Sequence, residues 1–159
     1  MVIKDDLISF SFQLDRGMIY VKAAVEGQTG DFILDTGAPG LVVNEIPRGA
    51  TTDYQAQSCS QEVVIGVKPV KIFSWANRTL RNLEAITLDL SHLDELHEAE
   101  VVGMIGYELL KSNTLFIDYQ RSQLSLLKNR MNVALTVPAA RIPFALYDHL
   151  PVICLLYTS

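Results

Sequence analysis

The segment FILDTGAPGLVVN, residues 32–44, constrains the fold more than any other part of the chain. Its residues 32–34 and 41–43 are apolar, and Asp35 lies between these two runs. Short apolar runs separated by small residues are typical of buried strands joined by a tight turn. Because a carboxylate is costly to bury without hydrogen-bonding partners, we expect this turn to hold Asp35 in a defined polar setting.

Most other segments also have the pattern of short strands separated by turn residues. The predicted strands cover residues 8–12, 18–25, 63–65, 70–75 and 83–90. The predicted turns cover residues 26–30, Gly66, Pro69 and Asn77. The pattern predicts an all-β protein, a barrel with one short helix.

A second motif lies well downstream of Asp35, in the segment VVGMIGYELLKSNTLFIDYQRSQLSL that begins at Val101. It contains the apolar-apolar-glycine signature Met104-Ile105-Gly106. The segments that follow are predicted as a short helix at residues 107–111 and as strands at residues 115–119 and 123–127. Two motifs in a fixed order are far more specific than a single Asp-Thr-Gly, which arises by chance.

Together, Asp-Thr-Gly-Ala and the downstream signature resemble the active-site motifs of the retropepsin-like aspartic proteases, in particular their bacterial single-lobe or tandem-lobe group. The resemblance covers residues 7–128. It implies a closed acid-protease barrel with one short helix after the second motif. It places a protease lobe at residues 1–137, and it interprets residues 138–159 as a linker and a candidate start of a second lobe.

The resemblance implies an aspartic endopeptidase in which Asp35 supplies one of two catalytic carboxylates. The second carboxylate would come from another copy of the chain in a homodimer, or from a second lobe. The substrate would be a peptide or protein, and neither a metal nor another cofactor is needed. Thr36 would lock the two catalytic loops together, and Gly37 would let the substrate backbone lie beside the site.

The resemblance also implies roles for residues outside the acidic turn. Met104, Ile105 and Gly106 would support the loop that carries Asp35. Substrate binding falls to Ala38, Ile65 and Gly66, the last two in a flap at residues 60–70 with Gly66 as its mobile tip. The alternative for this flap is an ordinary hairpin.

The chain departs from the retroviral pattern at two places. Many retroviral enzymes have an acid after the Asp-Thr-Gly-Ala and an arginine after the downstream glycine. Here Pro39-Gly40 and Tyr107-Glu108 occupy those positions, so the ion pair that braces the retroviral dimer is absent. Two other readings stay open: a non-catalytic binding or dimerisation module of the same fold, and a β-barrel unrelated to proteases.

The C-terminal segment resembles the start of the domain, as an internal repeat would. When the two segments are aligned, Ile8, Phe10 and Phe12 match Ile142, Phe144 and Leu146, and one gap follows these three pairs. A second catalytic acid is then expected near position 169, as far beyond Phe144 as Asp35 lies beyond Phe10. Chance similarity is the alternative. The last six residues, 154–159, resemble non-native read-through sequence.

Composition excludes several classes of function. The chain has 159 residues and a net charge of −5, without a basic stripe, so nucleic-acid binding is not expected. Its apolar runs are strand-sized, so no membrane-spanning segment is expected. The N-terminus MVIKDDLISF does not have the pattern of a signal peptide, and the compartment stays open.

Neither the cysteines nor the histidines form a metal-binding pattern. Cys59 and Cys154 lack metal-ligand spacing, and a disulfide framework is not expected. His92 and His97 lie among acids in DLSHLDELHEAE, but their spacing puts them on different helix faces. The leucines of this segment favour a solvated amphipathic turn over a metal site.

Overall fold

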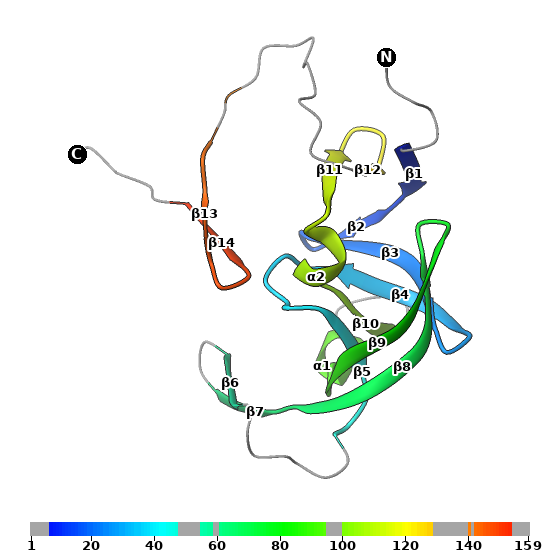
Figure 1. Ribbon diagram of the computed structural model, residues 1–159, viewed down its shortest axis with the longest axis vertical. Helices are drawn as coiled ribbons and strands as arrows, with labels where there is room; N and C mark the ends of the chain where they lie inside the picture. Colours follow the sequence, from blue (N-terminus) through cyan, green and yellow to red (C-terminus); the bar gives the residue numbers. More distant parts are fainter. Residues whose placement is uncertain are drawn as a thin grey trace, which may run out of the picture.

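The computed structural model describes residues 7–47, 55–58, 61–94, 100–128, 140 and 142–153. Its centre is a closed barrel, in which hydrogen bonding runs in the order β3-β4-β10-β5-β9-β8 and a β3–β8 pairing closes the ring (Figure 1). The barrel strands are β3 (Met18–Val25), β4 (Gln28–Leu34), β10 (Val101–Ile105), β5 (Leu41–Asn44), β9 (Arg78–Leu88) and β8 (Gly66–Trp75). The predicted all-β, closed-barrel fold class is confirmed.

Smaller elements surround the barrel. The short strand β2 (Gln13–Asp15) pairs with β3. A separate sheet has the order β1 (Leu7–Ser11), β12 (Gln123–Lys128) and β11 (Asn113–Asp118). Two hairpins are formed by β6 (Gln55–Ser58) with β7 (Gln61–Val64) and by β13 (Ala145–Tyr147) with β14 (Leu150–Val152). Within the described residues, the helices are α1 (Ser91–Asp94) and α2 (Tyr107–Leu110).

The apolar side chains of the barrel strands form two clusters, one on each face of the barrel wall. Successive residues of a strand face opposite sides, so Phe32 lies in one cluster and Ile33 in the other. Phe32 is fully buried and meets the ring of Phe73 edge to face, with centroids 5.5 Å apart. The second cluster includes Leu90, the residue directly before α1, so α1 begins beside this cluster.

Several predicted boundaries hold, and others differ. Strand β3 has its predicted bounds, and α2 falls within the predicted helix at residues 107–111. The turn predicted at residues 26–30 is shorter, because only Glu26 and Gly27 have positive φ and β4 already begins at Gln28. The segment around His92, predicted as a solvated amphipathic turn, is the four-residue helix α1, with His92 exposed and Leu93 packed against the second cluster.

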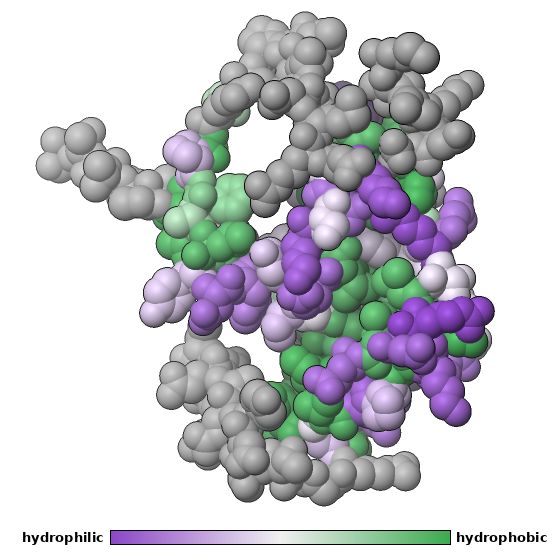
Figure 2. Space-filling view, viewed as in Figure 1, coloured by the Kyte–Doolittle hydropathy of each residue, from purple (hydrophilic) through white to green (hydrophobic). Residues whose placement is uncertain are grey.

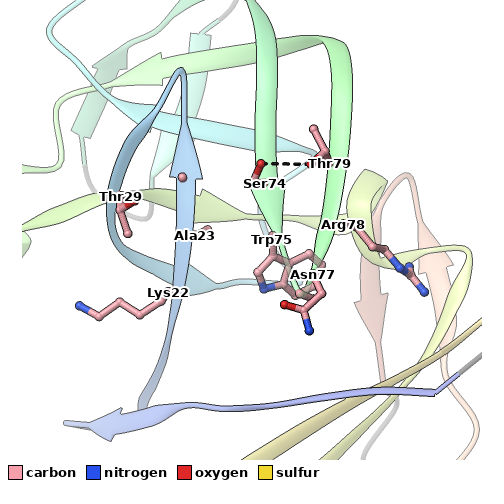
Figure 3. Close-up of a pocket in the computed structure, with 10 residues that line it drawn as sticks. Lys22, Ala23, Thr29, Ser74, Trp75, Asn77, Arg78 and Thr79 are labelled. Carbon is pink, nitrogen blue, oxygen red and sulfur yellow. Dashed lines mark hydrogen bonds between the residues drawn. The ribbon is translucent and has the colours of Figure 1, made fainter.

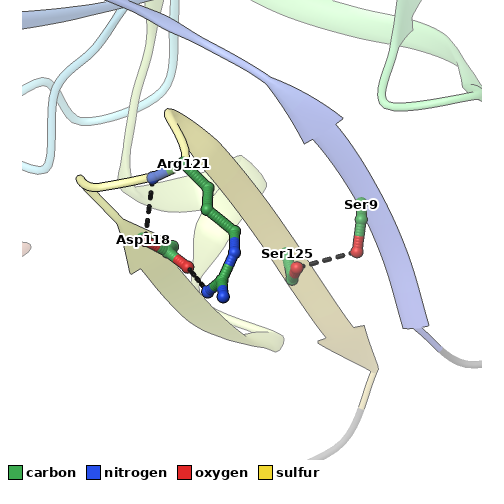
Figure 4. A network of polar contacts seen from close by, with 4 residues as sticks. All are labelled: Ser9, Asp118, Arg121 and Ser125. Atoms are coloured by element: carbon green, nitrogen blue, oxygen red, sulfur yellow. Dashed lines mark hydrogen bonds and ion pairs between the residues drawn. The ribbon is translucent and has the colours of Figure 1, made fainter.

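The turn between β11 and β12 is closed by one acid. Asp118 accepts a hydrogen bond from the Arg121 backbone N–H (3.0 Å) and forms an ion pair with its guanidinium (2.8 Å), as Figure 4 shows. The same figure shows Ser9 and Ser125 joined at 2.7 Å between β1 and β12. Asp118 therefore has a local structural role at the end of its strand.

The hydrogen bonds from Arg121 hold the pKa of Asp118 below its usual value of 3.8. A carboxylate with a lowered folded-state pKa stabilises the fold above its unfolded pKa, and this stabilisation is lost as the pH falls through the folded value. We expect Arg121→Gln to move the Asp118 titration towards 3.8, as measured by the carboxyl carbon shift in NMR. An unchanged midpoint would contradict the assigned cause.

Candidate active site

Asp35 directly follows β4, at the point where that strand is held by the second motif. Strand β4 runs parallel to β10, and Leu34 pairs with Ile105. The backbone N–H of Asp35 donates to the carbonyl of Ile105 (3.0 Å), which continues the pairing one residue further. The position of the acid is therefore fixed by the buried strand β10.

Residues 35–40, between β4 and β5, form the acidic turn, which binds its own carboxylate. The Gly37 N–H donates to Asp35 Oδ1 (2.7 Å), and the Ala38 N–H donates to the Asp35 carbonyl (3.2 Å). Asp35 is half-buried, whereas Thr36 and Gly37 are exposed. A hydrogen bond from a backbone N–H fixes the orientation of the carboxyl group. The turn thus presents an oriented carboxylate beside an exposed hydroxyl and an exposed backbone.

The downstream glycine allows two backbones to meet. A Cβ added to Gly106 would lie 2.4 Å from the Ala38 carbonyl oxygen and 2.5 Å from that of Gly40. Next to it, the Tyr107 N–H donates to the Ala38 carbonyl (2.8 Å), and the Glu108 N–H donates to the Pro39 carbonyl (3.0 Å). The first N–H groups of α2 would otherwise lack intrahelical partners. The acidic turn and α2 therefore complete each other's hydrogen bonding.

Met104 and Ile105 support the turn from opposite faces of β10. Ile105 is fully buried in the cluster that contains Phe32, and Met104 packs against the cluster that contains Ile33. Ala38 is 7% exposed and belongs to the second of these clusters. The structure thus brings Met104, Ile105, Gly106 and the acidic turn together.

The flap predicted at residues 60–70 does not have Gly66 at its tip. Gly66 is the first residue of β8, pairs with Thr87 and is buried. A Cβ on Gly66 would meet Thr87 Oγ1 at 2.6 Å and Pro47 Cβ at 3.2 Å, so its place as a mobile tip is wrong. Ile65, just before it, is also buried. The hairpin in this region is β6–β7, and residues 59–60 between its strands lie outside the described residues.

His149 is a neighbour of the acidic turn that sequence reasoning missed. Its Nε2 lies 3.1 Å from the Gly37 carbonyl, so in the matching tautomer the ring N–H donates to this oxygen. It belongs to the turn between β13 and β14, which Figure 1 places beside the loop after β4. A contact between residues so far apart in the sequence leaves no local pattern that could have revealed it.

A shallow hollow lies elsewhere on the barrel, between β3 and the β8–β9 turn (Figure 3). It is lined by residues that include Lys22, Trp75 and Arg78, and not by the acidic turn. Both cations have partners: Lys22 pairs with Asp31 (2.8 Å), and Arg78 donates to Asn113 (3.0 Å). The hollow is therefore separate from the acidic turn.

Within the described ranges, no three His, Cys, Asp or Glu side chains lie close enough together to hold a metal ion. His97, Cys59 and Cys154 lie outside those ranges. Of the helices that are described, none has the length and apolar character needed to cross a membrane.

Comparison with known proteins identifies the fold. No family model matches the sequence, and no curated protein sequence matches it. The structure is similar to the crystal structure of a retropepsin-like aspartic protease from Rickettsia conorii, with a TM-score of 0.51 and 16% identity. The match covers 76% of this chain and 90% of that one. The barrel therefore has a retropepsin-like fold.

Proposed function

We propose that this retropepsin-like chain is an aspartic endopeptidase in which Asp35 is one of two catalytic carboxylates. The observation that carries the proposal is the acidic turn. Its carboxylate accepts the Gly37 N–H at 2.7 Å, and its backbone is anchored to β10 and to the start of α2. Such pre-organisation is what a catalytic group needs, because reorientation during the reaction costs rate.

The chemistry requires two carboxylates about 3 Å apart that share one proton, since like charges at that distance cannot both ionise. The ionised carboxylate removes a proton from water, and the protonated one donates to the scissile carbonyl oxygen. Water adds to the carbonyl carbon without a covalent enzyme intermediate, and the C–N bond then breaks as the carboxylate that took the proton from water passes a proton to the leaving amine. The apparent pKa values belong to the pair and not to either acid.

The exposed residues of the turn have separate roles in this proposal. Thr36 is exposed, and we assign its hydroxyl to a hydrogen bond with the facing catalytic loop. Gly37 is exposed and lets the substrate backbone approach. The side chain of Ala38 is buried in the barrel wall, so we assign it to support of the loop and not to substrate contact.

The second carboxylate must come from outside the barrel described above. A two-fold axis in a homodimer would place a second Asp35 opposite the first. A second lobe in the same polypeptide would do the same. Either arrangement gives a substrate channel between two barrels, suited to an extended peptide or protein segment.

Cleavage of a diverse peptide library by the assembled protein, which holds both carboxylates, tests this function in the acid to neutral pH range. We expect products from extended, apolar peptides, because the acidic turn lies in an apolar part of the chain. The alternative is a binding module of the same fold, which would retain peptides without cutting them.

The pH dependence follows from the shared proton. We expect the rate to be highest in the acid range and to fall towards neutral pH, as the pair loses the proton that the carbonyl oxygen must receive. Initial rates on one substrate across this range measure it. A flat profile from acid to neutral pH would contradict the dyad mechanism.

A further inference from the structure

The hairpin β13–β14 is apolar on both faces and has no core of its own. Its strands pair only with each other within the described part of the chain. Phe144, Leu146, Tyr147 and Val152 are between 47% and 74% exposed. Figure 2 shows the apolar residues gathered over this hairpin. An isolated two-stranded hairpin is at best marginally stable in water, so this one needs a partner.

The hairpin repeats the geometry of β2–β3. Strand β2 begins at Gln13 and strand β13 begins at Ala145. The two hairpins superpose in sequence when Gln13 is aligned with Ala145, and this offset is the step from one hairpin to the other. Asp15 pairs with Met18, and Tyr147 pairs with Leu150, each across a two-residue turn. The first turn residue has positive φ in both hairpins: 47° in Arg16 and 55° in Asp148. The two hairpins therefore have the same turn length and the same register.

With Gln13 aligned to Ala145, residues 10–21 match residues 142–153 without a gap. This alignment replaces the gapped one that the sequence alone suggested. The matched apolar pairs are Phe10 with Ile142, Phe12 with Phe144, Leu14 with Leu146, Met18 with Leu150, Tyr20 with Val152 and Val21 with Ile153. In the barrel, Phe12, Tyr20 and Val21 are at most 6% exposed. Their counterparts in the second hairpin are those that a second barrel would bury.

The hairpin also lies at the acidic turn. His149, in its own turn, is 3.1 Å from the Gly37 carbonyl. A barrel that started from this hairpin would begin beside the first catalytic loop. The step from Gln13 to Ala145, applied to Asp35, places the corresponding acid at position 167, slightly earlier than the gapped match predicts.

We propose that β13–β14 is the first hairpin of a second barrel of the same fold, and that this barrel supplies the second carboxylate. The inference rests on the proposed function for the role of that carboxylate. The partner of the apolar hairpin is then the remainder of its own barrel, in the same polypeptide. Homodimerisation of the first barrel is not needed.

The first test is to read the gene beyond residue 159. The proposal predicts an aspartate at position 167, followed by Thr or Ser and then Gly, with an apolar run before it. Its absence would overturn the second barrel without touching the role of Asp35.

The second test uses the natural polypeptide and the present chain, which ends at Ser159, side by side. We expect the polypeptide to cleave peptides as a monomer in sedimentation, and to lose cleavage when either aspartate is replaced by Asn. Mixing these two inactive variants should not restore cleavage, because each molecule carries its own pair of loops. The chain that ends at Ser159 should be inactive at every concentration.

The outcomes separate the two proposals. Cleavage by a homodimer of the chain that ends at Ser159, or rescue on mixing, would overturn the second barrel as the source of the carboxylate and keep the peptidase. A polypeptide with both acidic turns that cuts no peptide would overturn the peptidase, while the predicted acid at position 167 would still support the second barrel.

Discussion

Replacing Asp35 by Asn is expected to remove peptide cleavage, with a loss on the order of 10³-fold or more in kcat/KM, while the fold remains intact. The amide cannot take a proton from water as a carboxylate does. Its oxygen can still accept the Gly37 N–H that now binds Oδ1 at 2.7 Å, so the turn keeps its hydrogen bond. Initial rates and thermal unfolding of the assembled protein measure the two effects.

Asp118→Asn is the matched control for this variant. Asp118 also accepts a backbone N–H within a turn, yet its partners belong to Arg121 and not to the acidic turn. We expect this variant to keep the cleavage rate. Activity retained by Asp35→Asn, or lost equally in both variants, would remove Asp35 from the chemistry.

Gly106→Ala should strongly destabilise the protein. The added methyl group would lie 2.4 and 2.5 Å from the carbonyl oxygens of Ala38 and Gly40. These are backbone atoms of a loop tied to α2 by hydrogen bonds from Tyr107 and Glu108, so they cannot move without breaking those bonds. We expect a cost of about 3 kcal/mol in the free energy of unfolding, at the upper end for overpacking.

Gly40→Ala provides the comparison in the same loop. The nearest atom to its added Cβ is Glu108 Cβ at 3.8 Å, an ordinary contact distance. We expect this variant to stay within about 0.5 kcal/mol of the wild type in denaturant unfolding. Equal effects of Gly106→Ala and Gly40→Ala would show that the close approach of α2 to the acidic turn does not limit stability.

The centre of the candidate site was predictable because its signals are local. Asp35 lies between apolar strand segments, which local pattern shows, and Gly106 was placed by its resemblance to the downstream retropepsin-like motif. The structure shows the reason for this pairing of motifs: the carbonyls of the first meet the N–H groups of the second.

The errors arose where a tertiary contact decides the role of a residue. Gly66 has the pattern of a turn, but it is a strand residue whose lack of a side chain leaves room for Thr87 and Pro47. The register of the internal repeat also needed structure. The strand pairs Asp15–Met18 and Tyr147–Leu150 mark equivalent positions that the gapped alignment displaced.

The central claim is that the acidic turn serves the tetrahedral addition of water and does more than bind peptide. The most direct measurement compares two binding affinities by calorimetry. One is the affinity for a peptide that the protein cleaves, and the other is the affinity for an analogue in which a hydroxyl-bearing tetrahedral carbon replaces the scissile carbonyl. An aspartic peptidase should bind the analogue at least about 10²-fold more tightly, and this preference should vanish in Asp35→Asn. Equal affinity for the two compounds would contradict catalysis and leave a binding module.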